Sequence, residues 1–364
     1  MPRRCNLPLR PWTTSGARRT RHAARGTRKG IGANGYHTHP DRARDGAPCS
    51  ARPARRAVAP SRRRDRIPSA AVSPRDFGLV LLSAVLHALW GSAIKRSDDP
   101  VLFNWLQMAV SIPLAAAVLV ASPGLAELDG GFWAWVALAL VFHTLYMLWL
   151  GSALAVADLS LVYPLARSTP AFLPFAAAGL LGERISMAGG FGIATVVVGM
   201  WLVQTRGRPH WQALRQRGAG FAWLTLAATV GYGVTDKAAM TTLDAAAWRA
   251  PIPRAVSYFF IVNAGSALLL LPVALRRGRG AVHAQLRREA PRVAAALAAS
   301  VVGYSLILEA LRSAPASYVV AVRQASVLFA VAIGALWFGE RPGGARALGA
   351  LVIVAGVALV GFAG

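Results

Sequence analysis

Residues 162–203 decide the fold of this chain. They read VYPLARSTPAFLPFAAAGLLGERISMAGGFGIATVVVGMWLV, and the pattern returns at residues 319–360 as VVAVRQASVLFAVAIGALWFGERPGGARALGALVIVAGVALV. At a constant offset of 157 residues, Gly182-Glu183-Arg184 aligns with Gly339-Glu340-Arg341, and an apolar run flanks each triplet on both sides. Each flank approaches the roughly 20 apolar residues that an α-helix needs to cross the hydrocarbon layer. The repeated unit therefore predicts two membrane spans joined by a very short turn.

Both triplets are predicted to be structural turns. A glycine that follows a helix can adopt the positive φ angle that closes it, which assigns Gly182 and Gly339 to helix ends. Glu183 and Glu340 stand just before the next helix, where a carboxylate favours the positive end of the helix dipole. Direct action of these two carboxylates on a substrate or a proton is the alternative.

The composition indicates a membrane protein. Hydrophobic residues make up 55% of the 364 residues and charged residues only 15%, with long uncharged apolar runs. The formal net charge of +25 is uneven, because residues 1–76 hold 19 of the 40 Lys and Arg against four acidic residues. Both cysteines, Cys5 and Cys49, lie in this basic part. The membrane part therefore has no disulfide and no cysteine metal site.

Residues 1–74 are rich in Arg, Pro, Ala and Gly and show almost no apolar periodicity. Such a composition cannot bury enough apolar surface to offset the entropy of ordering, so a disordered tail is predicted. A basic tail of this kind binds anionic lipid headgroups or nucleic acid. The alternative is that translation starts near Val72 or beyond. The preceding Arg-rich sequence would then come from a gene start placed too far upstream.

From Phe77 onward the pattern predicts ten spans. Their predicted limits are 77–94, 100–121, 132–153, 159–181, 187–205, 219–237, 254–275, 293–311, 317–338 and 344–362. Glycine and alanine dominate the fifth and the tenth, which predicts close packing of helix backbones there.

The two groups of five spans are related to each other. Trp90-Gly91 followed by Lys95 matches Tyr232-Gly233 followed by Lys237 at an offset of 142 residues. Because five is an odd number, the second group enters the membrane from the opposite side, as in the inverted repeats of secondary transporters. The predicted fold class is an all-α integral membrane protein with ten transmembrane helices in two inverted five-helix repeats. The predicted divisions are the tail 1–74, the first repeat 75–205, a basic linker loop 206–218 and the second repeat 219–364.

This pattern resembles the drug/metabolite transporter superfamily, specifically its EamA-type members. The resemblance covers residues 77–364 and rests on the Trp-Gly-x3-Lys motif, on the Gly-Glu-Arg turn of each half and on the glycine-spaced helix that follows each turn. It implies a multi-pass secondary transporter of the cell membrane (the cytoplasmic or inner membrane), without ATP hydrolysis and without a cofactor. It leaves the solute open among amino acids, nucleotide precursors, sugars or their phosphates, and toxic compounds. The stretch HALWGSAIKRSDD at 87–99 also looks like a subset found with phosphonate metabolism.

Charged residues inside a span are costly and so indicate a function or a partner. Arg167 and Arg323 lie well inside the fourth and ninth spans, and Gln324 aligns with Arg167 in the repeat. Two guanidinium groups at similar depth predict a site for a carboxylate, phosphate or phosphonate. The alternative is that they bind helix-terminal carbonyls or snorkel to the surface. The candidate substrate-binding residues are Arg167, Arg323, Gln324, Tyr163, His87, Trp90, Tyr232, Lys95 and Lys237.

Other polar residues of the spans have simpler interpretations. Glu309 precedes Arg312 by three residues, which predicts a salt bridge, with Arg323 nearby. Snorkelling is the ordinary explanation for Lys95 and Lys237, and packing is the ordinary explanation for His143.

The predicted function is secondary transport of a small, polar, anionic metabolite by alternating access. The alternatives are a drug or amino-acid exporter, a phosphonate-associated permease, a nucleic-acid binder acting through the tail, and an intramembrane enzyme. The sequence has no HExxH motif, no paired intramembrane carboxylates and no serine elbow, so no catalytic or metal site is predicted. The expected partners are the solute and the lipid bilayer, no nucleic acid is expected, and a homodimer is compatible with the sequence. The loop charges leave the orientation of the termini open.

Overall fold

The computed structural model describes residues 72–125, 127–156, 164–207, 219–246, 250–338 and 343–363. Every regular element in these ranges is helical, so the predicted all-helical class is confirmed for the described part of the chain. The chain divides into two units, Met1–Ser61 and Arg62–Gly364, and all described residues lie in the second. The predicted tail lies outside the described residues up to residue 71, and so do Tyr163, Gly339 and Glu340.

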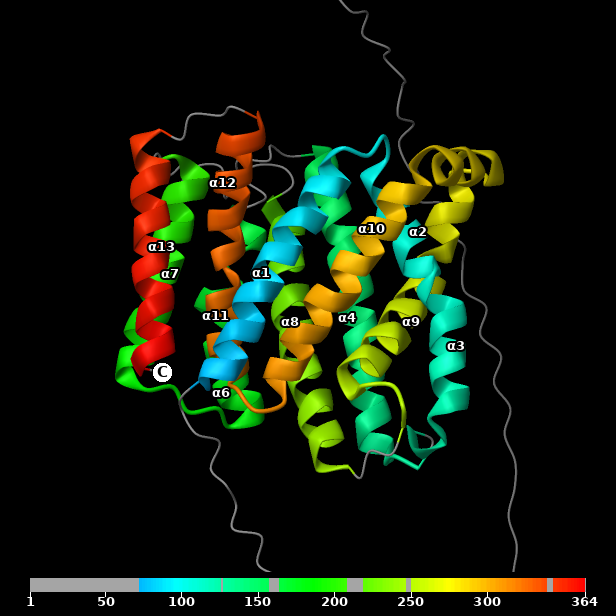
Figure 1. Ribbon diagram of the computed structural model, residues 1–364, viewed down its shortest axis with the longest axis horizontal. Helices are drawn as coiled ribbons and strands as arrows, with labels where there is room; N and C mark the ends of the chain where they lie inside the picture. Colours follow the sequence, from blue (N-terminus) through cyan, green and yellow to red (C-terminus); the bar gives the residue numbers. More distant parts are fainter. Residues whose placement is uncertain are drawn as a thin grey trace, which may run out of the picture. The chain divides into compact units, whose positions relative to one another are not determined.

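The described part of the chain contains the following helices. They are α1 (Pro74–Lys95), α2 (Pro100–Ala109), α3 (Ser111–Ala121), the 3₁₀ turn η1 (Pro123–Leu125), α4 (Gly130–Val156), α6 (Thr169–Leu181), α7 (Met187–Thr205), α8 (Ala219–Ala245), α9 (Arg254–Arg276), α10 (Arg279–Leu311), α11 (Ala316–Arg323), α12 (Ala325–Phe338) and α13 (Gly344–Ala363) (Figure 1).

Six helical segments of the described part are long and apolar enough to cross a membrane, with α2 and α3 counted as one. Large apolar side chains such as Val120, Phe175 and Phe362 are exposed on the outside of the bundle. Exposed apolar surface of this extent is costly in water and favourable against lipid tails. The chain is therefore a multi-pass membrane protein.

Short sequence signals begin and end these helices. Ser73 precedes Pro74, and its hydroxyl accepts a hydrogen bond from the Asp76 N–H at 3.0 Å. Asp99 precedes Pro100, and its carboxylate accepts from two N–H groups of the first turn of α2. Both are N-cap residues followed by proline at the first helical position, where the missing N–H is no loss. Gly182 ends α6 with a φ angle of 69°, as predicted for the turn.

Two spans are interrupted at equivalent positions of the repeat. The fourth predicted span breaks at Arg167 and Ser168, just before α6, and the ninth breaks at Gln324, between α11 and α12. Hydrogen bonds at both breaks run between residues three apart, from Ser168 N–H to Leu165 and from Gln324 N–H to Ala321. Such tightened turns inside a span mark sites where the backbone departs from the regular helix.

The helices α7 and α13 pack side by side along their length (Figure 1). A Cβ atom added at Gly199 would lie 2.8 Å from the carbonyl oxygen of Gly349, and one at Gly349 would lie 2.8 Å from the carbonyl oxygen of Gly199. The same reciprocal contact joins Gly192 and Gly356, at 3.2 and 2.9 Å. The predicted close packing of the fifth and tenth spans is thus confirmed, with the two helices antiparallel and in backbone contact.

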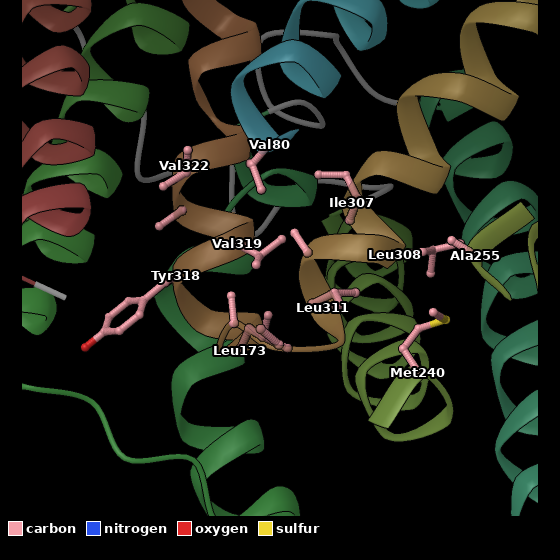
Figure 2. Close-up of a cluster of buried hydrophobic side chains, with 14 of the residues drawn as sticks. Val80, Leu173, Met240, Ala255, Ile307, Leu308, Leu311, Tyr318, Val319 and Val322 are labelled. Carbon is pink, nitrogen blue, oxygen red and sulfur yellow. The ribbon is translucent and has the colours of Figure 1, made fainter. Parts of the chain in front are cut away.

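The side chains of α11 lie in the main apolar core, where this helix packs against α1, α6, α7 and α13 and also contacts α8 and α10. Tyr318, Val319 and Val322 of this helix are completely buried. Figure 2 shows Val319 and Tyr318 pointing to different sides of α11. The other labelled members of this cluster are Val80 of α1, Leu173 of α6, Met240 of α8, Ala255 of α9 and Ile307, Leu308 and Leu311 of α10. The helix that ends at Arg323 is therefore packed against several other helices.

We predict that Gly199→Ala destabilises the bundle by about 1–3 kcal/mol, because the added methyl group has no space between the two backbones. Gly190→Ala, on the same helix, is the matched control, since nothing lies within 4 Å of a Cβ atom there. Alanine favours a helix over glycine by roughly 1 kcal/mol, so the control should be at least as stable as the wild type. Thermal unfolding of the purified full-length protein in detergent measures both. Equal stability of the two variants would contradict the close contact.

Candidate functional site

The carboxylate of Asp236 lies at the centre of a network of polar and aromatic side chains inside the bundle. Asp236 is on α8 and has no solvent exposure. Tyr258 of α9 donates its hydroxyl to Oδ1 at 2.7 Å, and Tyr304 of α10 donates to Oδ2. His143 of α4 places Nε2 3.3 Å from Oδ2. Four helices thus converge on one buried carboxylate.

Arg323 adjoins this network from the end of α11. Its guanidinium carbon lies 5.3 Å from the centre of the Tyr304 ring, within the range of a cation–π contact. Its Nη2 lies 3.4 Å from Nδ1 of His87 on α1. A guanidinium can only donate hydrogen bonds, so Nδ1 of His87 is the acceptor and the imidazole proton belongs on Nε2. Among the described residues no carboxylate forms an ion pair with Arg323.

A line of side chains continues from His87 toward α2. Trp90 stacks on the His87 ring with 5.1 Å between centroids, and its Nε1 donates to Oε1 of Gln107 at 3.0 Å. Gln107 in turn donates to Oδ1 of Asn104. These donors and acceptors satisfy one another, which is required because unpaired polar groups in a membrane interior are costly.

Tyr232 joins the network on the side of α4. It lies one helical turn before Asp236 and stacks on the His143 ring, with 4.3 Å between centroids. Tyr146 meets the ring of Tyr232 edge to face, with 5.8 Å between centroids. The site is therefore lined mainly by aromatic rings with a few polar atoms, a composition typical of small-molecule sites.

Arg167 lies at the interruption before α6 and within electrostatic range of His87. The break next to it is stabilised by Ser168, whose hydroxyl donates to the Pro164 carbonyl at 2.7 Å and accepts from Trp201 Nε1 at 3.1 Å. Arg167 and Arg323 thus lie at the equivalent breaks of the predicted fourth and ninth spans.

The other candidates from the sequence have different surroundings. Lys237 is buried and donates to the carbonyls of Leu311 and Ala314 at 2.7 and 3.0 Å, so it neither snorkels nor points toward Asp236. Gln324 is buried and donates to the Val320 carbonyl of its own helix at 3.3 Å. The side chain of Lys95 and all of Tyr163 lie outside the described residues.

Sequence reasoning missed the centre of this network. Asp236, Tyr258 and Tyr304 were not among the candidate residues, and His143 was interpreted as a packing residue. An aspartate inside an apolar span was itself the available signal, since intramembrane ionisable groups indicate function. The two tyrosines carry no such signal, because aromatic residues are ordinary components of spans.

A cluster of charged groups lies at the end of the bundle where α1 begins and α10 ends (Figure 1). Arg312 forms ion pairs with Glu309 and with Asp244, both at 2.5 Å, and Glu309 also binds Arg75 at 3.0 Å. The predicted Glu309–Arg312 pair is therefore present, and the second arginine on Glu309 is Arg75. Arg323 makes its contacts elsewhere, with His87 and Tyr304.

Glu183 ties the turn of the first half to a helix of the second. Its carboxylate accepts hydrogen bonds from the N–H of Ala316 at 2.6 Å, and from the N–H and hydroxyl of Ser317 at 3.3 and 2.8 Å. It thus caps α11, whereas the sequence predicted that it acts on the helix that follows it. Ser186 caps that helix, α7, by accepting from the Gly189 N–H at 2.9 Å.

We predict that Glu183→Ala lowers the stability of the bundle by about 0.5–2 kcal/mol, because the first N–H groups of α11 lose their acceptor. Arg184→Ala is the matched control, since Arg184 is exposed and adjacent in the same turn. Thermal unfolding in detergent and limited proteolysis of the 311–317 segment measure the difference. A Glu183→Ala variant as stable and as resistant as the Arg184→Ala variant would contradict the capping role.

The described residues hold no group of three or more His, Cys, Asp or Glu that could bind a metal ion.

Comparisons with known proteins agree with this description. Residues 221–362 match the model of the EamA-like transporter family. A solved structure titled only "Crystal structure of protein" is similar with a TM-score of 0.56 and 19% sequence identity, covering 80% of this chain and 98% of that chain. At this identity the likeness shows the fold alone. Comparison with curated proteins found no match. The resemblance inferred from the sequence is confirmed, because the matched residues span most of the second predicted repeat.

Proposed function

We propose that this multi-pass membrane protein, of which residues 221–362 match the EamA-like transporter family, carries a small anionic metabolite across the cell membrane. It does so as a secondary transporter, by alternating access between two inverted halves. The solute binds at Arg323, beside His87 and Tyr304 and within reach of the field of Arg167.

The observation that carries the proposal is the position of Arg323. This cation sits at a helix interruption inside the bundle, and its described contacts are an imidazole nitrogen and an aromatic ring, neither of which carries a formal negative charge. A guanidinium keeps its charge at any working pH and presents a planar set of donors that matches a carboxylate, phosphate or phosphonate. No described carboxylate contacts Arg323, and an anion bound there would supply its countercharge.

The pairing of helices supports two inverted halves. Glycines 192 and 199 contact glycines 356 and 349 in a reciprocal way, as the two sides of a two-fold interface do. The helix α4, in the third predicted span, packs against α8, which belongs to the first span of the second half. In the same way, α1, in the first predicted span, packs against α10, which belongs to the third span of the second half. Interrupted helices at equivalent depth are a recurrent way to build a central site in such transporters.

We predict that Arg323→Lys lowers the transport efficiency for an anionic solute by about 10-fold or more, because the charge remains but the two-pronged geometry is lost. Arg323→Gln and Arg167→Gln should reduce it as well, and Arg323→Gln further than Arg323→Lys. Uptake into proteoliposomes that contain the full-length protein measures the effect. The labelled probes are inorganic phosphate, methylphosphonate and small carboxylates, with amines and neutral amino acids in parallel.

The matched control is Arg287→Gln, because Arg287 is an exposed arginine of α10 outside the network. Each variant is first shown to elute as a folded species in detergent. Anion uptake by Arg167→Gln and Arg323→Gln equal to that of the control would show that these arginines only hold helices together. A preference for amines or neutral solutes would favour a drug or amino-acid exporter instead.

A further inference from the structure

Asp236 and Lys237 are adjacent buried charges with different kinds of partner. Lys237 binds two carbonyl oxygens, whereas the partners of Asp236 are two hydroxyls and an imidazole. Within ion-pair distance, its one described basic partner is His143, which carries a positive charge only when protonated. A fully buried carboxylate therefore depends on a titratable group for its countercharge.

Titratable and charged side chains near Asp236 come from several of the neighbouring helices. His143 belongs to α4, Tyr258 to α9, Tyr304 to α10 and Arg323 to α11. On α8 itself, Tyr232 stacks on His143, while the Lys237 ammonium binds the carbonyls at the end of α10. The described residues of α6 include no titratable side chain.

Tyr304 connects this carboxylate to the arginine site. Its hydroxyl donates to Oδ2 of Asp236, and the face of its ring carries the Arg323 guanidinium at 5.3 Å. One tyrosine thus contacts both the buried acid and the proposed anion-binding cation. Charges this close in a medium of low dielectric constant interact strongly, so a change at one changes the other.

We propose that the carboxylate of Asp236, beside His143, binds a proton, and that the proton and the anion bind to the transporter together. The second part rests on the proposed function of Arg323. Arg323 and Arg167 contribute positive charges to this region, and the unprotonated Asp236 contributes a negative charge. An anion at Arg323 brings a second negative charge near Asp236, and a proton on Asp236 removes the repulsion between the two. Each ligand therefore favours the binding of the other. The resulting transport is symport of one proton with a monovalent anion.

The decisive experiment needs no solute. Infrared difference spectra of the full-length protein in lipid, recorded between about pH 5 and 8, detect the carbonyl stretch of a protonated carboxylic acid. We expect such a band in the wild type, its loss in Asp236→Asn, and its retention in Asp244→Asn. Asp244 is the matched control because it lies on the same helix and pairs with Arg312 at the end of the bundle.

Two further variants test the link to the arginine site. Arg323→Gln removes a positive charge, so the midpoint of the Asp236 band should move upward by on the order of one pH unit, as anion binding would also do. Tyr258→Phe removes one hydrogen bond to Asp236 and should shift the frequency of the same band. It also identifies the band if Asp236→Asn does not fold.

Each outcome decides one part of the proposal. A wild-type spectrum without a band that Asp236→Asn or Tyr258→Phe alters would overturn the proton site, even if anion uptake depends on Arg323. A band whose midpoint is the same in Arg323→Gln would overturn the coupling. Conversely, a confirmed band together with anion uptake that ignores Arg323 would leave the proton site standing and reject the proposed function.

Discussion

The interior of this bundle is arranged around the cost of a buried charge. Neither lipid nor apolar side chains can solvate a carboxylate or an ammonium group, so each must find hydrogen-bond partners within the protein. Asp236 and Lys237 are adjacent in the sequence and opposite in charge, yet their side chains satisfy this demand separately. The carboxylate accepts from Tyr258 and Tyr304, and the ammonium donates to carbonyls at the end of α10. Because Lys237 is used elsewhere, Asp236 is left with His143 as its described basic partner.

Packing and charge also cooperate to place Arg323. The segment that leads into α11 is held from both halves, since Lys237 binds carbonyls at residues 311 and 314 and Glu183 binds the N–H groups of residues 316 and 317. The apolar face of α11 is buried against its neighbours (Figure 2), and the helix then ends at Arg323, beside the break at Gln324. The hydrogen bonds of Lys237 and Glu183 at the start of α11 thus help to determine where the Arg323 guanidinium lies at its end.

The sequence predicted several features correctly. The all-helical membrane class, the glycine turn at Gly182 and the close packing in the predicted fifth and tenth spans follow from local patterns, namely apolar run length, glycine position and small residues at helical spacing. The break at Gln324 has no proline near it and was not predicted. Among the candidate residues, Arg323, His87 and Trp90 form one connected group, whereas Lys237 and Gln324 bind backbone carbonyls.

The sequence by itself determined the membrane class, the helical repeat and the presence of ionisable residues inside spans, because these depend only on residue type and spacing along the chain. The tertiary structure decided the partner of each charge. Glu183 caps a helix 133 residues away instead of the one that follows it, and His143 meets Asp236 across 93 residues. Such pairs depend on which faces of distant helices meet, and hydrophobic periodicity is nearly silent on this point when a helix is apolar all round. The centre of the site was therefore decided by helix packing, which the linear pattern does not encode at the level of single residues.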